Sequence, residues 1–514
     1  MKMVKSLLLG SAAGIVAVAG AQAADLPVKA KPVEYVKVCS AYGAGFYYIP
    51  GTDICLRVGG YVWSEYEVND LGAGALSTTA GAIGGDFIRN RADDWTSFRV
   101  RFDMIFDART NTEYGTLRSY ASVGWQWTTN LDGFQQQQLP ATTGNYAWYY
   151  DRAFIQFAGL TFGYVGSFFD FDPSLVLSQQ TSKSFKFAPA IAYTAQLGSG
   201  ISASVSMEDS TTRRTHIQTT GVLAGAFTQG YFGPSSTINI GNNILVVPIA
   251  LQNSGWAANS YAGQFMPDFI ANLRVDQAWG DAQVSGAIHQ LKATLGGAGQ
   301  TLIDSVGAVA PIPGLPLAKD KYGYAALAGI NLKLPMLGAG DSFQVEGAWA
   351  RGAVDYTGTS ANPYSNNTGV GYRKGAIGPV IDLMDAFIGS DQQLHLSTAY
   401  SINAELRHFW TPTLRSSVAY GYNKYTAPAR SQGACGANVA GNGDNCAYPD
   451  GKINQVSANL IWSPVPKLDL GLEGVWMNIK TDCGGLAAAA CAADNTRGKS
   501  IDTFGGIFRA RRDF

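Results

Sequence analysis

The stretch Phe504–Phe514, FGGIFRARRDF, decides the fold that this sequence predicts. One set of alternate positions is mostly apolar, and the other carries Arg509, Arg511 and Asp513. Because successive side chains of a strand point to opposite faces, the alternation predicts a β-strand with one face in a nonpolar phase. We expect this strand, which ends on an aromatic residue, to pair with the first strand of a closed transmembrane barrel.

The amino-terminal residues have the pattern of an export signal. Lys2 and Lys5 precede the apolar run Leu7–Ala19, and Ala21-Gln22-Ala23 is a small-residue cleavage pattern. A membrane anchor is the alternative, but the run is shorter than the ~20 residues that a spanning helix needs. We expect residues 1–23 to be a signal peptide. Its two lysines account for a change in formal charge from -1 to -3 in the mature chain.

The composition narrows the class of protein. Charged residues make up 15% of the chain and aromatic residues 12%, so it is too aromatic and too weakly charged to be disordered. The 61 glycines fit a barrel, which needs tight turns and aromatic girdles. A soluble chain of this length would have two or three domains, yet no linker divides it. We expect a periplasmic segment over 24–53 and a transmembrane barrel over 54–514.

The same alternation recurs along the chain. Trp95–Asp107 sets Phe98 and Phe102 on one face against Arg99 and Arg101 on the other. Roughly sixteen segments alternate in this way, and half of them have the ~9–11 residues of a tilted spanning strand. They are Ile54–Glu67, Trp95–Asp107, Leu117–Trp127, Arg152–Phe157, Leu160–Val165, Phe185–Leu197, Ile201–Glu208, Phe269–Trp279, Ala282–Lys292, Gly323–Leu334, Phe343–Arg351, Leu394–Trp410, Leu414–Tyr422, Ile453–Trp462, Leu468–Trp476 and Phe504–Phe514.

The connections between these segments alternate in length. Gly280-Asp281 and Thr411-Pro412-Thr413 are short, whereas Asp209–Asp268, Ala293–Tyr322 and Gly352–Gln392 are long. Short turns on one side and long external loops on the other are typical of an outer-membrane barrel, and an even strand count puts both termini on the periplasmic side. An all-β sandwich is the alternative, but it would need a polar outer face instead of the Leu-, Phe- and Val-rich face found here.

The six cysteines fall into three local pairs: Cys39 with Cys55, Cys435 with Cys446, and Cys483 with Cys491. In an exported chain, an even number of cysteines predicts disulfides in preference to free thiols. A metal site is not predicted, because no CxxC motif and no His/Cys cluster accompanies them.

No sequence pattern of a catalytic site occurs. The four histidines are scattered, and neither HExxH nor GxSxG is present. An outer-membrane protease or lipase would need a Ser/His/Asp geometry that scattered residues do not predict. We therefore expect no enzyme, no cofactor and no nucleic-acid partner.

The segment Gly166–Ser184 is less polar than the other loops, since it carries Phe168 and Phe171. Such a loop needs a sheltered place, which the barrel interior provides. Folded inward, it would present Asp170 and Asp172 to the lumen.

Several arginines share the inward parity on nearby strands and are expected to face those aspartates: Arg57, Arg99, Arg101, Arg118 and Arg152. Opposed acidic and basic walls at a narrowing select solutes by size and charge, which predicts a pore constriction here. Alternatively, these arginines only line a wet lumen and pair with Asp103 and Asp107.

Val33–Val62, VEYVKVCSAYGAGFYYIPGTDICLRVGGYV, resembles the start of mature porins of the alphaproteobacterial outer-membrane porin family. Thr112–Val123, Phe157–Phe171 and Gly505–Phe514 are similar to later parts of that family. The resemblance implies homotrimers of sixteen-stranded barrels in outer-membrane lipid, which passively admit small hydrophilic solutes and ions. It also implies an inward third external loop, here Phe168–Ser184. The enlarged loops 209–268, 293–322 and 352–392 match no pattern of the family.

Two other functions are alternatives. A substrate-specific channel would have an aromatic path for sugars, and a structural or adhesive barrel would bind a partner through its long loops. The aromatic path would comprise Trp63, Tyr120, Phe168, Phe169 and Phe171. An energy-coupled transporter is not expected, since the ~30 residues between Ala24 and Cys55 are too few for a globular plug.

Overall fold

The computed structural model describes residues 37–68, 82–83, 96–128, 145–178, 180–215, 217–219, 236–240, 243–247, 256–257, 261–293, 302–303, 309–310, 319–358, 370–371, 381–388, 393–428, 449–493 and 497–514. The chain divides into two compact units, residues 1–56 and 57–514. The predicted signal peptide lies outside the described residues and stays a prediction.

The described part of the first unit is a small disulfide-linked hairpin. Strand β1 (Tyr47–Tyr48) pairs antiparallel with the first two residues of β2 (Cys55–Val68), and a 3-10 turn, η1 (Ser40–Tyr42), precedes it. The predicted disulfide between Cys39 and Cys55 is present, with a Cα–Cα distance of 5.9 Å. The two sulfurs and Phe46 form its small buried core. The periplasmic location of this hairpin stays a prediction.

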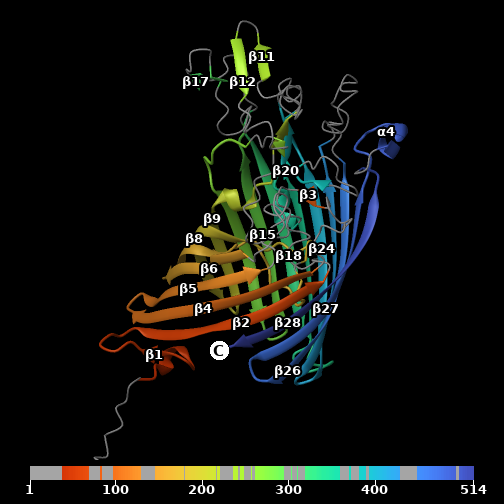
Figure 1. Cartoon of the computed structure of the whole chain (residues 1–514). Coiled ribbons are helices and arrows are strands. Elements are labelled where there is room, and N and C mark those ends of the chain that lie inside the picture. The colour runs from red at the N-terminus through yellow and green to blue at the C-terminus, as the bar shows by residue number, and fades with distance from the viewer. Residues whose placement is uncertain are drawn as a thin grey trace, which may run out of the picture. The chain divides into compact units, whose positions relative to one another are not determined.

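Sixteen strands of the second unit, with β2 as the first, form a closed antiparallel barrel (Figure 1). The others are β4 (Thr96–Thr112), β5 (Gly115–Thr128), β6 (Asn145–Phe157), β7 (Leu160–Gly166), β8 (Phe187–Gly198), β9 (Ile201–Glu208), β14 (Asp268–Gln277), β15 (Gly280–Leu291), β18 (Lys321–Lys333), β19 (Ser342–Arg351), β24 (Thr398–Thr411), β25 (Leu414–Thr426), β26 (Gly451–Val465), β27 (Leu468–Thr481) and β28 (Ser500–Asp513).

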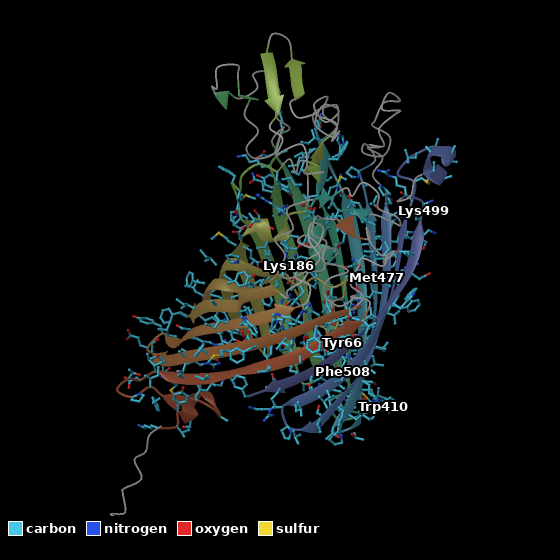
Figure 2. All side chains as sticks on the ribbon, viewed as in Figure 1. Tyr66, Lys186, Trp410, Met477, Lys499 and Phe508 are labelled. Carbon is cyan, nitrogen blue, oxygen red and sulfur yellow. A yellow bond between two sulfur atoms is a disulfide. The ribbon has the colours of Figure 1, made fainter. Side chains whose placement is uncertain are left out.

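Closure occurs where the predicted last strand meets the first. Each strand pairs with the next in the order given, and β28 returns to β2 with Phe508 opposite Tyr66. Both of these aromatic side chains are labelled in Figure 2. The closed ladder leaves no open edge, as backbone groups in lipid require. The predicted sixteen-stranded barrel is therefore confirmed.

The predicted alternation of faces is visible in side-chain burial. On β2, Val62 and Tyr66 are 43% and 40% exposed, whereas Glu65 and Glu67 are each 1% exposed. The same contrast holds on β4, where Phe98 is exposed and Asp103 is fully buried. Apolar residues therefore cover the outer face, and most of the charged residues of the strands point inward.

One predicted strand, Leu394–Trp410, is two strands in the structure. The break falls at Ser397, whose backbone N–H donates to the carbonyl of Asp385 at 3.0 Å. Residues Leu394–Leu396 form β23, which pairs with β22 (Ala386–Ile388) and not with the barrel. The alternation continues through the break, so the sequence pattern could not reveal that the backbone changes its partner.

The remaining elements are short. They are β3 (Ala82–Ile83), η2 (Ser210–Arg213), β10 (Ile217–Thr219), β11 (Ser236–Ile240), β12 (Asn243–Val247), β13 (Trp256–Ala257), β16 (Leu302–Ile303), β17 (Val309–Ala310), η3 (Val354–Thr357), β20 (Val370–Gly371), β21 (Ile381–Asp382) and α4 (Ala488–Ala493). No helix in the described ranges is long and apolar enough to cross a membrane.

The predicted bridge between Cys483 and Cys491 is also present, and its two Cα atoms are 5.5 Å apart. It links the two sides of the short α4 loop. The third predicted pair, Cys435 with Cys446, lies outside the described residues and stays a prediction.

Candidate pore constriction

The connection between β7 and β8, Ser167–Lys186, is an inward loop. It contacts inward-facing side chains of strands other than its own two, from β14 to β28. On β14, the amide of Asn272 donates to the carbonyl of Phe168 at 2.6 Å, and on β28, Arg509 donates to the carbonyl of Leu177 at 3.2 Å. The predicted inward fold of this loop is confirmed.

Four buried glutamates, Glu208, Glu346, Glu405 and Glu473, form a carboxylate ladder under the inward loop. Glu473 shows their role, because it accepts hydrogen bonds from the backbone N–H groups of Leu177 at 2.5 Å and Ser178 at 2.7 Å. The other acceptor–donor pairs are Glu208 with Phe168, Glu405 with Leu175, and Glu346 with Ser184. A buried N–H without a partner is costly, so these carboxylates keep the loop against the wall.

Aromatic side chains anchor the same loop. Phe169 is fully buried and Phe171 is 8% exposed, in a cluster with Leu327, Tyr356 and other residues of β14, β15, β18 and β19. The Phe171 ring lies against Gly329, where a Cβ atom would come within 2.5 Å of it. Both rings are therefore covered, and neither offers the open face that an aromatic sugar path would require.

The two predicted aspartates of the loop each bind an arginine outside the five predicted ones. Asp170 pairs with Arg213 of η2 at 2.6 Å, and Asp172 pairs with Arg274 of β14 at 3.0 Å. The Arg213 side chain is only 1% exposed. Burial by itself would lower the pKa of Arg213, but the attraction of Asp170 and Asp355 outweighs it and raises that pKa.

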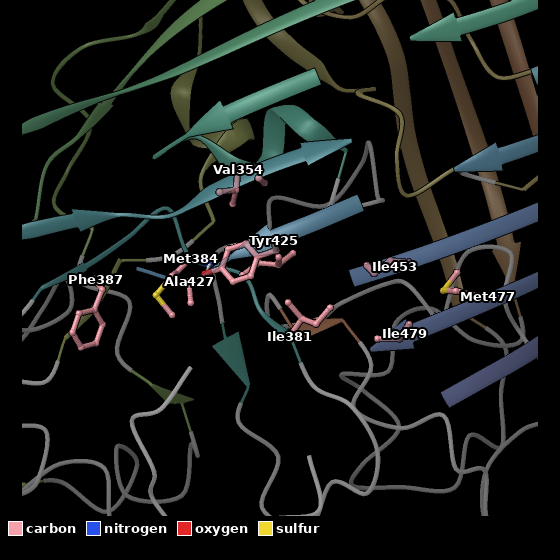
Figure 3. Close-up of a cluster of buried hydrophobic side chains, with 11 residues drawn as sticks. Val354, Ile381, Met384, Phe387, Tyr425, Ala427, Ile453, Met477 and Ile479 are labelled. Carbon is pink, nitrogen blue, oxygen red and sulfur yellow. Dashed lines mark hydrogen bonds between the residues drawn. The ribbon is translucent and has the colours of Figure 1, made fainter. Parts of the chain in front are cut away.

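A second stretch of chain lies inside the long-loop end of the barrel. This inner segment, Ile381–Ile388, packs with its Ile381, Met384 and Phe387 side chains in an apolar cluster (Figure 3). The barrel contributes inward-facing residues to the cluster: Ala399, Tyr425, Ile453, Met477 and Ile479. A polar lumen does not explain apolar residues at these inward positions, but the inner segment that covers them does.

Asp385 ties the inner segment to three other parts of the chain. Its carboxylate accepts the backbone N–H groups of Thr215 and Val354, each at 2.9 Å, and the hydroxyl of Tyr261 at 2.9 Å. Burial raises the pKa of Asp385, and the neighbouring His289 and N–H donors only partly offset this. Among the described residues, no group of three His, Cys, Asp or Glu side chains could hold a metal ion.

The arginines predicted for the constriction lie together on a different part of the wall. Arg57, Arg99, Arg101, Arg118 and Arg152 project from β2, β4, β5 and β6, and together they are the arginine wall. Their carboxylate partners lie deeper than the guanidinium groups. The side chains of Arg57 and Arg152 are 45% and 42% exposed, whereas those of their partners Asp107 and Asp151 are 0% and 15% exposed.

Ion pairs hold this wall in place. Asp107 lies 2.9 Å from Arg118 and 3.8 Å from Arg57, while Glu65 lies 3.4 Å from Arg99. Pairing with Asp107 agrees with the alternative stated above, and Asp103 accepts a hydrogen bond from Ser122 at 2.6 Å. The structure does not pair any of the five arginines with Asp170 or Asp172.

Guanidinium groups also cover the aromatic rings of this wall. Arg101 and Arg509 lie 4.6 Å and 4.4 Å from the centre of the Trp63 ring, and Arg118 lies 5.0 Å from that of Tyr120. Cation–π contacts of this kind fix the arginines in position. They also cover ring faces that the sugar-channel alternative needs.

Arg213, Arg274, Asp385 and the carboxylate ladder were not predicted from the sequence as parts of this region. The inward parity of Arg274, Glu405 and Glu473 was visible in the alternation. Their partners were not, because an alternating pattern does not show which loop will cover which strand. Arg213 and Asp385 lie in enlarged loops that carried no recognisable pattern.

A closed sixteen-stranded antiparallel barrel with an inward loop belongs to the class of Gram-negative outer-membrane barrels. The family model described as "Porin subfamily" matches residues 25–503, and the chain belongs to this family. The resemblance to alphaproteobacterial porins is thereby confirmed.

Known proteins with similar sequences are also porins. Porin Omp2b of Brucella melitensis biotype 1 is 37% identical over 220 residues, which are 40% of this chain and 54% of the relative. Porin Omp2b of Brucella suis biovar 1 matches with the same identity and coverage. The chain thus spans about half the length of these curated relatives. The outer membrane channel DcaP of Acinetobacter baumannii has a similar fold, with a TM-score of 0.52, 15% identity, and coverage of 91% of this chain and 99% of that one.

Proposed function

We propose that this protein is a general diffusion porin, a water-filled channel that lets small hydrophilic solutes and ions cross the outer membrane passively. The observation that carries the proposal is the inward loop, which the carboxylate ladder binds across the inner faces of β9 to β27. A loop held in this way narrows a barrel whose inner face is polar.

The proposed constriction lies between the inward loop and the arginine wall. Arg57 and Arg152 are its most exposed charges, while Arg99, Arg101 and Arg118 support them from less exposed positions. On the loop, Asp172 is 20% exposed and can act on passing ions, whereas Asp170 is 6% exposed and acts by holding the loop. Charged groups at a narrowing select solutes by charge as well as size.

Two features argue against a sugar-specific channel. Of the aromatic rings proposed for its path, Phe169 and Phe171 are buried under the loop, and guanidinium groups cover Trp63 and Tyr120. A homotrimer, which the family resemblance implies, belongs to the proposal. Cross-linking of the detergent-solubilised protein should yield trimers, and a purely monomeric product would contradict that part.

Planar-bilayer recording tests the function. The purified protein should give ohmic single-channel conductance that no oligosaccharide blocks saturably. Saturable block would favour the sugar-specific alternative. Absence of conductance from protein with the heat-modifiable mobility of a folded barrel would favour a structural or adhesive role instead.

A further inference from the structure

Three lysines lie side by side on the outer face of the barrel. The strand register pairs Lys424 of β25 with Lys452 of β26, and Lys452 with Lys480 of β27. Like the exposed Val418, Leu460 and Leu472 on the same strands, all three have even residue numbers, so they lie on the same face of the barrel. The three side chains, which we call the lysine row, therefore face the membrane and not the lumen.

The lysine row has no ion-pair partner in the described part of the chain. Lys452 and Lys480 are exposed and Lys424 is partly buried. The nearest carboxylates of the same face accept other hydrogen bonds. Asp502 accepts from Trp476 at 3.2 Å and from Asn478 at 3.0 Å.

The next carboxylates beyond the lysine row, Asp450 and Asp482, accept backbone N–H groups. Asp450 accepts that of Ala427 at 3.0 Å, and Asp482 accepts that of Gly484 at 2.9 Å. Both aspartates therefore hold the chain where the strands end, and neither forms an ion pair with a lysine of the row.

The neighbouring rows of the outer face place the lysines at a membrane boundary. Beside the lysine row lies a polar row of Tyr422, Asn454, Asn478 and Asp502, followed by a row of Tyr420, Val456, Trp476 and Phe504. Beyond these, Val418, Leu460 and Leu472 are bare aliphatic surface. This order, from charge through aromatic to aliphatic side chains, is that of a membrane interface.

The row lies at the long-loop end of the barrel. Figure 2 shows Lys499, which pairs with Thr481 next to the row, at the opposite end of these strands from Trp410. The same end of β9, β14 and β15 presents Met207, Phe269 and Ile288 to the membrane. Basic residues are thus absent from the described outer face at this end of β9, β14 and β15, and general solvation of the rim does not explain the three adjacent lysines of β25–β27.

Directly opposed like charges on neighbouring strands repel one another, because their Cβ atoms are only ~4.5–5.5 Å apart. A single anion near all three ammonium groups turns this repulsion into attraction. We propose that the lysine row is a binding site for the phosphate group of an anionic lipid of the outer leaflet. The adjoining aromatic and aliphatic rows then pack against the acyl chains of the same lipid, which free phosphate lacks.

The test uses the full-length mature protein in mild detergent, with phosphatidylglycerol as the anionic probe and phosphatidylcholine as the neutral one. Native mass spectrometry measures how much of each lipid stays bound. The variant K424Q/K452Q/K480Q should bind phosphatidylglycerol on the order of 100-fold more weakly, from about one kcal/mol per lysine. Phosphatidylcholine binding should be unchanged, and high salt should weaken the binding of wild-type protein.

Two controls isolate the row. The variant K319Q/K333Q/K467Q removes the same charge from exposed positions outside it and should bind like wild type. The variant K424R/K452R/K480R should also retain binding, and it keeps the test valid if the glutamine variant fails to fold. Equal phosphatidylglycerol retention by wild type and the glutamine variant would overturn the proposal. So would displacement of the lipid by equimolar inorganic phosphate, since that would identify a site for free phosphate.

Discussion

Two halves of the barrel interior use buried carboxylates in opposite ways. Under the inward loop, Glu405 and Glu473 accept backbone N–H groups, and Glu405 also lies 3.8 Å from the ammonium of buried Lys183, so the wall there is covered by protein. On the other half, Glu65 and Asp107 accept guanidinium groups, so the wall there carries exposed positive charge. All four side chains share the inward parity of their strands and are almost fully buried.

This difference shows that the partner, and not the residue type, decides what an inward carboxylate does. A glutamate that accepts the backbone N–H groups of a loop anchors that loop. A carboxylate that pairs with an arginine is itself buried, and the more exposed guanidinium group faces the lumen. The charge that a solute meets is therefore more positive than a count of inward residues on this half suggests.

The largest effect should follow from removing the anchors. The variant E405A/E473A leaves the N–H groups of Leu175, Leu177 and Ser178 without acceptors. This should destabilise the bound position of the loop by on the order of 3–9 kcal/mol. The channel should then show higher and noisier conductance. Trypsin should also cleave after Lys183, which is buried in the wild-type protein.

A matched change on the other half sharpens this comparison. E67Q alters a buried glutamate of the arginine wall without touching the loop, so tryptic cleavage at Lys183 should stay at the wild-type level. Loop release by E67Q, or none by E405A/E473A, would show that the two halves are not independent.

The next effect concerns Asp170 and its buried partner. D170N leaves the Arg213 guanidinium buried without full compensation, which should lower the free energy of unfolding by about 3–5 kcal/mol. D172N should lower the free energy of unfolding much less, because Arg274 still forms ion pairs with Asp276 at 3.2 Å and with Asp281 at 2.8 Å. Urea unfolding in lipid vesicles measures both. Equal losses would mean that Asp170 and Asp172 have the same role.

A smaller effect should come from the inner segment. D385N weakens the hydrogen bonds that the residue 385 side chain accepts from Thr215, Val354 and Tyr261. It should lower the free energy of unfolding by about 1–2 kcal/mol. If the inner segment narrows the long-loop end of the lumen, the variant should raise conductance and leave the reversal potential in a salt gradient unchanged. A changed reversal potential with unchanged conductance would refute that role.

The smallest energetic effect, but a clear electrical one, should come from the exposed arginines. R57Q/R152Q removes charges whose ion pairs contribute at most about 1 kcal/mol to stability. It should shift the reversal potential toward cation preference, most strongly at low salt. R99Q/R101Q should shift it less, since these side chains are less exposed. The opposite order would place the selective charges deeper in the wall.

The sequence predicted most of the barrel, because alternation with period two is a local property that lipid on one side enforces. The strands, the pairing of β28 with β2 and the inward loop were all predicted. The break at Ser397 was not, since residues on both sides of it continue the alternation. It arises from hydrogen bonds with the inner segment, whose position inside the barrel the alternation does not show.

For the candidate site, the sequence alone determined which side chains face the lumen: the five arginines, Glu405, Glu473 and Arg274 all followed from parity. Only the tertiary structure decided their partners. Asp170 binds Arg213 from an enlarged loop, and Asp172 binds Arg274, instead of the arginines of the opposite wall. The physical reason is that parity is fixed by each strand alone. The pairing of a loop residue depends instead on where the whole chain places buried counter-charges, and no local pattern encodes that placement.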